Sequence, residues 1–168
     1  MSRLHKIVTL CTAVLVGVSS GYAQEGAKIV LDGSTTVGPI AKAFAEYYMG
    51  KHPEVNITVS ESGSGNGAKA IINGTADIGN LSRKMKEEEF QAAKDKGVNV
   101  IEHVVAMDAL VIVVHPSNPV KGLTKDELKQ IYIGEITNWK QLGGPDRKIV
   151  VISRDTNSGT YETFQLLV

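Results

Sequence analysis

The chain has 168 residues, of which 42% are hydrophobic and 21% charged, and its formal net charge at pH 7 is zero. These values are typical of a globular protein. They argue against a nucleic-acid or anionic-membrane surface, because either would require an excess of basic residues. A neutral chain can still bind anions if its site is built from backbone dipoles instead of bulk charge.

The first residues predict an export signal. A basic start precedes an apolar run over residues 7–18, and Gly21 and Ala23 are the small residues of a cleavage site. The apolar run is too short for a comfortable transmembrane helix, although an uncleaved anchor is the alternative. We therefore expect residues 1–23 to be a cleavable signal peptide and the protein to lie in the periplasm or elsewhere outside the cytoplasm. Cys11 is the only cysteine, so the mature chain has no disulfide and no thiolate site.

The rest of the chain alternates between predicted strands and helices. Strands are predicted at residues 28–31, 55–59, 76–79, 98–101, 104–114 and 149–152, and helices from residue 39, at 68–72, 86–96 and 124–132, and from residue 161. Thr124 and Glu127 form a capping box, and Leu123 and Leu128 are placed as its hydrophobic staple. The alternation predicts an α/β fold with mostly parallel pairing, in which the long apolar segment 104–114 is a central strand.

Three predicted strand-to-helix turns are rich in serine, threonine and glycine, and they span residues 33–36, 62–67 and 157–160. Such a turn presents unpaired backbone N–H groups and the positive end of a helix dipole. In open α/β sheets these turns gather at the carboxyl ends of the strands, where ligands bind. Three turns aimed at one point would form a cradle for a small tetrahedral anion, and Arg154 could add a forked contact. Alternatively, each turn only caps its own helix.

Motifs of other anion sites and of enzymes do not fit. Residues 63–69 lack the Lys-Ser or Lys-Thr pair of a P-loop and the spacing of a dinucleotide site, and no nucleophile elbow occurs. His52, His103 and His115 are scattered without metal-ligand spacing. We therefore predict no catalytic residues, no metal and no cofactor.

Four motifs are distinctive together: L-D-G-S-T-T-V-G-P at 31–39, S-G-S-G-N-G-A-K-A-I at 62–71, L-T-K-D-E-L-K-Q-I-Y-I-G-E-I-T-N-W at 123–139, and S-R-D-T-N-S-G-T-Y-E-T-F at 153–164. With them the chain resembles the phosphate-binding proteins of bacterial high-affinity phosphate ABC importers. The resemblance covers nearly all of the mature chain, and the last two motifs are strongly specific in combination. Members of that family are half as long again, so the resemblance implies a chain that is truncated at its C-terminus.

The resemblance implies a periplasmic-binding-protein-like, two-lobed α/β architecture with phosphate buried between the lobes. Lobe one would comprise residues 26–104, incomplete without a C-terminal return, and lobe two residues 105–168, with a crossover within 104–114. The implied function is capture of inorganic phosphate and its delivery to the membrane permease subunits of an ABC importer. The protein would be a monomer that binds no nucleic acid and is not an enzyme.

The resemblance also assigns phosphate contacts to the three turns, to Ser82 and to Arg154. The implied ligand-binding residues are Thr35, Thr36, Ser64, Ser82, Arg154, Ser158, Gly159 and Thr160. Thr35 and Thr36 would bind through backbone N–H and hydroxyl groups. Gly33 and Ser34 would support the first turn, and Asp155 would hold the Arg154 guanidinium in place.

One residue departs from the family pattern. Arg83 stands where well-known members have an aspartate that accepts the proton that phosphate keeps and sulfate lacks. Asp32, Glu61 or Asp108 could accept that proton instead, or selectivity is weaker. Arg83 itself could be a second anion contact or a residue of the lobe surface.

Three other functions remain open at this point. The first is a binding protein for another oxyanion, such as sulfate, molybdate or tungstate. The second is a phosphate-releasing hydrolase with the same cradle, which would need a metal cluster or an activated nucleophile. The third is an adhesion or signalling protein that keeps the fold without the ligand.

Overall fold

The computed structural model describes residues 26–168, so the predicted signal peptide at 1–23 lies outside the described residues. In chain order the elements are β1 (Lys28–Gly33), α1 (Gly38–Lys51), β2 (Asn56–Ser60), α2 (Ser64–Asn73), β3 (Ile78–Asn80), α3 (Glu87–Asp95), α4 (Lys125–Tyr132), the 3-10 helix η1 (Trp139–Leu142) and α5 (Gly159–Leu167). None of the helices within residues 26–168 combines the length and apolar composition that a membrane span requires.

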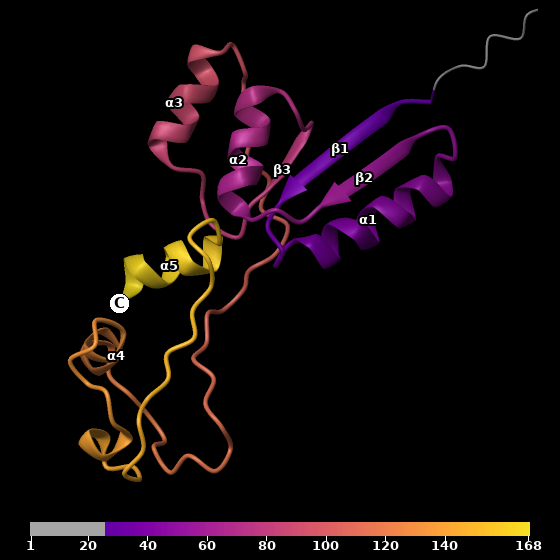
Figure 1. Cartoon of the computed structure of the whole chain (residues 1–168). Helices are drawn as coiled ribbons and strands as arrows, with labels where there is room; N and C mark the ends of the chain where they lie inside the picture. The colour runs from indigo at the N-terminus through magenta and orange to yellow at the C-terminus, as the bar shows by residue number, and fades with distance from the viewer. Residues whose placement is uncertain (1–25) are drawn as a thin grey trace, which may run out of the picture.

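The strands β1, β2 and β3 form a parallel sheet in the order β2-β1-β3 (Figure 1). Leu31 of β1 is in register with Val59 of β2 and with Ile78 of β3. Helix α1 packs against β2, and α2 packs against β1 and β3. The α/β class and the parallel pairing are therefore confirmed. Because the three strands run in the same direction, their carboxyl ends meet at one edge of the sheet.

Helix α2 begins at Ser64, four residues before the start predicted from the sequence, so this boundary was wrong. Glycines disfavour a helix, but here they let α2 approach the sheet closely. A Cβ on Gly67 would stand 2.8 Å from both the carbonyl oxygen of Asp32 and the Cα of Gly33. Packing against the end of β1 thus offsets the low helix propensity of this segment.

The strands predicted at 98–101, 104–114 and 149–152 do not form, and this prediction is wrong for the described structure. Residues 98–114 and 148–157 run instead as extended connections between the sheet and the part that contains α4 (Figure 1). Val113 and Ile152 are 84% and 85% exposed. A strand is stabilised by its neighbours across the ladder, and within residues 26–168 these segments have no partner beyond an isolated bridge between Asn138 and Lys148.

The predicted helix at 124–132 is confirmed as α4, together with its capping box. The Glu127 N–H donates to Thr124 Oγ1 at 3.2 Å, and the Thr124 N–H donates to Glu127 Oε2 at 2.7 Å. Its last residue, Tyr132, stacks its ring at a tilt on Phe164 of α5, with the ring centroids 4.4 Å apart. This contact links α4 to the helix that follows the third turn.

Candidate anion-binding site

The first two turns lie side by side at the carboxyl edge of the sheet. The Ser34 N–H donates to the carbonyl of Asn80 at the end of β3, and the Gly63 N–H donates to the carbonyl of Gly33, each at 2.7 Å. Gly33 and Gly63 have φ angles of 136° and 101°, which residues with a Cβ rarely adopt. Glycine at these two positions therefore allows the turns after β1 and β2 to touch.

The third turn, although nearly a hundred residues further along the chain, docks on the N-terminus of α2. The Gly65 N–H donates to the carbonyl of Asn157 at 3.1 Å. A Cβ on Gly159 would overlap Ser64 Oγ and would stand 2.6 Å from Ser82 Oγ. The first residue of α5 must therefore lack a side chain for α5 to begin this close to α2.

Ser64 and Ser82 join the start of α2 to the segment after β3. Their hydroxyl oxygens lie 3.2 Å apart, and the Ser82 N–H donates to Ser64 Oγ at 3.1 Å. The Ser64 residue is fully buried. The structure thus brings Ser64, Ser82 and Gly159 into one cluster, although only the resemblance had grouped Ser82 with the turns.

Several backbone N–H groups at these helix starts remain available. The first N–H groups of a helix have no partner within it. In α5 the Tyr161 N–H donates to Ser158 Oγ and the Glu162 N–H donates to the Ser158 carbonyl, whereas Gly159 and Thr160 donate to no other described residue. In α2 the Ser64 N–H also donates to no other described residue, whereas the next three N–H groups all have acceptors. Two helix N-termini therefore offer unused donors.

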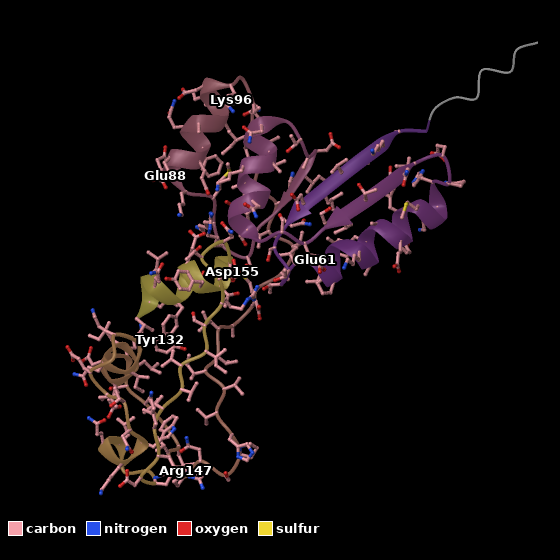
Figure 2. The ribbon with its side chains drawn as sticks, in the orientation of Figure 1. Glu61, Glu88, Lys96, Tyr132, Arg147 and Asp155 are labelled. Carbon is pink, nitrogen blue, oxygen red and sulfur yellow. The ribbon has the colours of Figure 1, made fainter. Side chains whose placement is uncertain are left out.

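Arg154 reaches the first turn from the extended segment before α5. Its Nη2 donates to Thr35 Oγ1 at 2.8 Å, so Thr35 and Arg154 lie together. The expectation that Asp155 holds the Arg154 guanidinium is wrong here. Asp155 Oδ1 instead accepts the Asn157 N–H at 2.9 Å, which shapes the loop just before α5 (Figure 2), and no ion pair joins Asp155 to Arg154 within the described chain.

Two of the predicted hydroxyls are engaged as caps. Ser34 Oγ accepts the N–H groups of Thr36 at 3.1 Å and Val37 at 3.3 Å, and Ser158 Oγ accepts the Tyr161 N–H at 3.4 Å. Ser34 and Ser158 are both buried. Capping and anion binding were posed as alternatives, but here the caps are part of the structure that holds the unused N–H groups in place.

Arg83 is buried between two carboxylates. Its Nη1 and Nη2 donate to the two oxygens of Glu89, each at 2.8 Å, and its Nε lies 3.1 Å from Glu162 Oε1. The hydrogen bond to Glu89 and the nearby charges of Glu89 and Glu162 raise the pKa of Arg83, although burial opposes them. Its side chain is 6% exposed. Neither suggestion made from the sequence, an anion contact or a surface residue, describes this environment.

The three candidate proton acceptors differ in position. Asp32 lies at the end of β1, where its Oδ1 accepts from Ser62 Oγ at 2.8 Å. Glu61 follows β2 and forms an ion pair of 2.9 Å with Lys42 (labelled in Figure 2). Asp108 lies in the exposed extended segment and accepts the N–H of Ala109. Asp32 and Glu61 are therefore at the edge where the turns meet.

Asn80 is a residue of this edge that the sequence did not single out. Its residue is 7% exposed, its carbonyl accepts the Ser34 N–H, and its Nδ2 is buried without a hydrogen-bond partner among the described residues. The signal available was its position, since β3 ends there beside the ends of β1 and β2. The sequence does not give the strand order, so it does not show that Asn80 lies beside the first turn.

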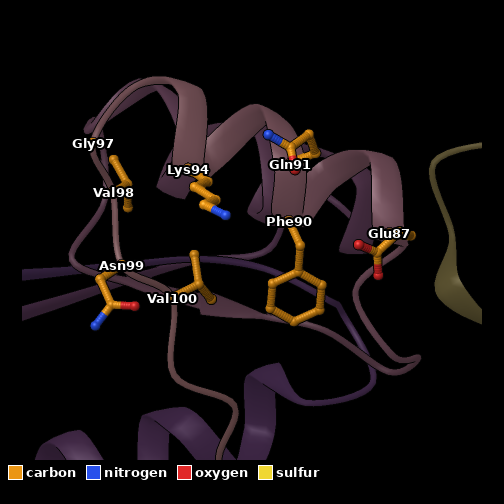
Figure 3. A pocket seen from close by; sticks show the side chains of 8 residues that line it. All are labelled: Glu87, Phe90, Gln91, Lys94, Gly97, Val98, Asn99 and Val100. Carbon is orange, nitrogen blue, oxygen red and sulfur yellow. The ribbon is translucent and has the colours of Figure 1, made fainter.

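A groove on the described surface lies elsewhere. It has a volume of about 400 Å³ and runs between α3 and the segment that follows it (Figure 3). Its lining residues are Glu87, Phe90, Gln91, Lys94, Gly97, Val98, Asn99 and Val100. None of them belongs to the three turns, so this groove is separate from the anion-binding site.

Comparisons with known proteins agree on one group. A family model described as a PBP superfamily domain matches residues 18–168. The chain is 42% identical over 156 residues to the protein SphX of Synechococcus elongatus, and 36% identical over 146 residues to the phosphate-binding protein PstS of Bacillus subtilis. These alignments span 89% and 87% of this chain, but 46% and 47% of the relatives.

Solved structures give the same result. A Clostridium perfringens protein assigned to a phosphate ABC transporter, crystallised with bound phosphate, is 44% identical and superimposes with a TM-score of 0.73 over 83% of this chain and 55% of that protein. An ABC-type phosphate transport receptor from Vibrio cholerae is 39% identical, with a TM-score of 0.67 over 82% of this chain and 54% of the receptor. The names of three of these four proteins describe binding or transport, whereas the name of SphX states no activity. The chain spans about half the length of the curated relatives it matches. These relatives are therefore longer than the sequence analysis expected, which was half as long again as this chain.

Proposed function

Because the chain belongs to the family of PBP superfamily domains, we propose that it captures inorganic phosphate where the three turns meet and delivers it to the permease subunits of an ABC importer. One observation carries the proposal. The N-termini of α2 and α5 converge beside Arg154 and Thr35, with backbone N–H groups left unused at both helix starts. Such an arrangement favours a small anion with several acceptor oxygens.

The chemistry of the cluster suits phosphate in particular. The N–H groups of Ser64, Gly159 and Thr160 and the Arg154 guanidinium are donors, and each phosphate oxygen can accept more than one hydrogen bond. Phosphate near neutral pH also keeps a proton that needs an acceptor. Asp32, at the end of β1, is the acceptor that we assign, because its second oxygen makes no hydrogen bond to another described residue. Sulfate, molybdate and tungstate have no such proton, so this carboxylate would disfavour them.

Export, the monomeric state and the two lobes are proposed by analogy with the same relatives. Delivery to an importer requires export, so the protein would act outside the cytoplasm after removal of residues 1–23, as a monomer. The predicted division into lobes at residues 26–104 and 105–168 would put the anion between them. A hydrolase has no comparable support among these relatives, since those whose names state a role are binding or transport proteins.

Isothermal titration calorimetry with phosphate, sulfate and molybdate in turn tests the proposal. The protein used should be the longest natural chain that contains these residues. We expect one phosphate per chain, with affinity that survives moderate salt because screening is weak at a buried site. Asp32→Asn should reduce the preference for phosphate over sulfate. Tighter binding of sulfate or molybdate by the unaltered protein would support the other-oxyanion alternative instead.

A further inference from the structure

Four charged side chains form a network between the segment around α3 and the first turn of α5. Arg83 and Glu89 are joined by two hydrogen bonds, and Glu162 lies 3.1 Å from Arg83 Nε and 2.7 Å from Lys86 Nζ. The side chains of Arg83, Glu89 and Glu162 are 6%, 16% and 14% exposed. Lys86, at 47%, is the most exposed of the four, and the two positive and two negative charges balance.

The network is tied directly to the anion-binding site through the backbone. Arg83 follows Ser82, whose hydroxyl and N–H contact Ser64 at the start of α2. Glu162 lies three residues after Gly159, in the same first turn of α5. One side of the network therefore reaches the start of α2 through Ser82, and the other side belongs to the start of α5. The predicted boundary between the lobes passes between the two sides.

Arg83 has little capacity left for a bound anion. Beyond the two hydrogen bonds to Glu89, its Nη1 donates to the Lys84 carbonyl at 3.0 Å, and its Nε faces Glu162. The Nε contact is an ion pair without a well-directed hydrogen bond, since this atom has no partner of good geometry among the described residues. The Arg83 guanidinium therefore binds the two carboxylates, and few of its N–H groups remain for a ligand.

We propose that Glu162, held by Arg83 and Lys86, is a positioning residue that keeps the start of α5 on the start of α2, so that the N–H groups of Gly159 and Thr160 and that of Ser64 face one bound anion. This inference rests on the proposed function, because it concerns the same site. Arg83 then serves phosphate binding without contacting phosphate. When the contact is lost, α5 can move away from α2 and the bound anion loses donors from one side.

Glu162→Gln is the most informative variant. It weakens the links to both Arg83 and Lys86, but leaves Arg83 paired with Glu89, so no guanidinium is left without a carboxylate. Coupling between a contact of this kind and a ligand site changes affinity by roughly 5- to 150-fold. We expect phosphate affinity to fall on the order of 10-fold, through faster dissociation and not slower association, because α5 opens more often once the contact is lost.

The matched control is Glu88→Gln. This substitution removes one negative charge, as Glu162→Gln does, but from α3. The Glu88 side chain is exposed and forms no ion pair or hydrogen bond within residues 26–168 (Figure 2). Glu162→Asp keeps the charge on a shorter side chain and provides a second variant if Glu162→Gln does not fold. Circular dichroism and urea unfolding identify folded variants, and calorimetry with stopped-flow kinetics gives the dissociation constant and rate for phosphate.

The proposal expects Glu88→Gln to match the unaltered protein, Glu162→Gln to dissociate phosphate about 10-fold faster, and Glu162→Asp to fall between them. A folded Glu162→Gln protein with an unchanged dissociation constant and rate would overturn the positioning role while leaving the proposed function intact. An unaltered protein that does not bind phosphate would overturn the proposed function itself, and this inference with it. The two failures are thus distinct in the first titration.

Discussion

Gly159→Ala tests the close approach of α5 to α2. The new Cβ would stand 2.6 Å from Ser82 Oγ, which is 0.8 Å short of the 3.4 Å at which ordinary contact begins, and it would overlap Ser64 Oγ as well. Overpacking of this kind typically costs about 1–3 kcal/mol. Separating Ser64 from Ser82 would also lose a hydrogen bond, worth about 1 kcal/mol. Alanine gains up to about 1 kcal/mol of helix propensity over glycine, so the net loss should be about 1–3 kcal/mol.

Urea unfolding of Gly159→Ala and of a matched control, Gly50→Ala, measures this difference. Gly50 also lies in a helix, α1, but nothing stands within 4 Å of its added Cβ. The control should therefore be neutral or stabilised, by up to about 1 kcal/mol. If α5 moves aside instead, Gly159→Ala will keep its stability and lose phosphate affinity. Unchanged stability together with unchanged affinity would refute the packing of Gly159 on the two serines.

Three further predictions concern single side chains. Arg154→Lys should weaken phosphate binding by about 1–3 kcal/mol, since a point charge cannot replace the planar fork; calorimetry measures this, and equal affinity would remove Arg154 from the site. Thr124→Ala should cost about 1 kcal/mol of stability by removing the α4 cap, seen in urea unfolding, whereas Ser at that position should retain it. Burial alone would raise the pKa of Glu89. The pKa nevertheless lies below its usual value, because Arg83 and the Lys86 N–H donate hydrogen bonds to the Glu89 carboxylate. The stability it contributes is therefore present above about pH 4.5 and is lost as the pH falls through its lowered pKa; Glu89→Gln should flatten this acid dependence, and an identical pH profile would contradict it.

The sequence predicted elements whose stability is local. The capping box of α4 is an example, because its hydrogen bonds join two residues only three positions apart, Thr124 and Glu127. The apolar segments 104–114 and 149–152 have the composition of strands, but a strand also needs a neighbour, and Val113 and Ile152 remain exposed. Strand composition therefore predicts an extended chain more safely than it predicts a ladder.

For the site, the sequence identified the three turns but not the contacts between them. Their convergence depends on the parallel order β2-β1-β3 and on the docking of Gly159 against Ser64, which no local pattern reveals. Arg83 illustrates the limit most clearly. Its partner Glu162 lies in a helix far along the chain. The residues next to Arg83 in the sequence do not reveal this ion pair, so the sequence alone allowed an anion contact or a surface position.

Amide NMR during a phosphate titration shows directly whether backbone N–H groups from separate turns bind one phosphate ion. We expect four amide signals to shift together and to saturate with one dissociation constant, because a hydrogen bond to an anion changes the shielding of the amide proton. They are the signals of Thr35, Ser64, Gly159 and Thr160. Sulfate at the same concentration should produce smaller shifts. Phosphate-induced shifts that spread over exposed lysines and leave these four amides unmoved would contradict binding at the three turns.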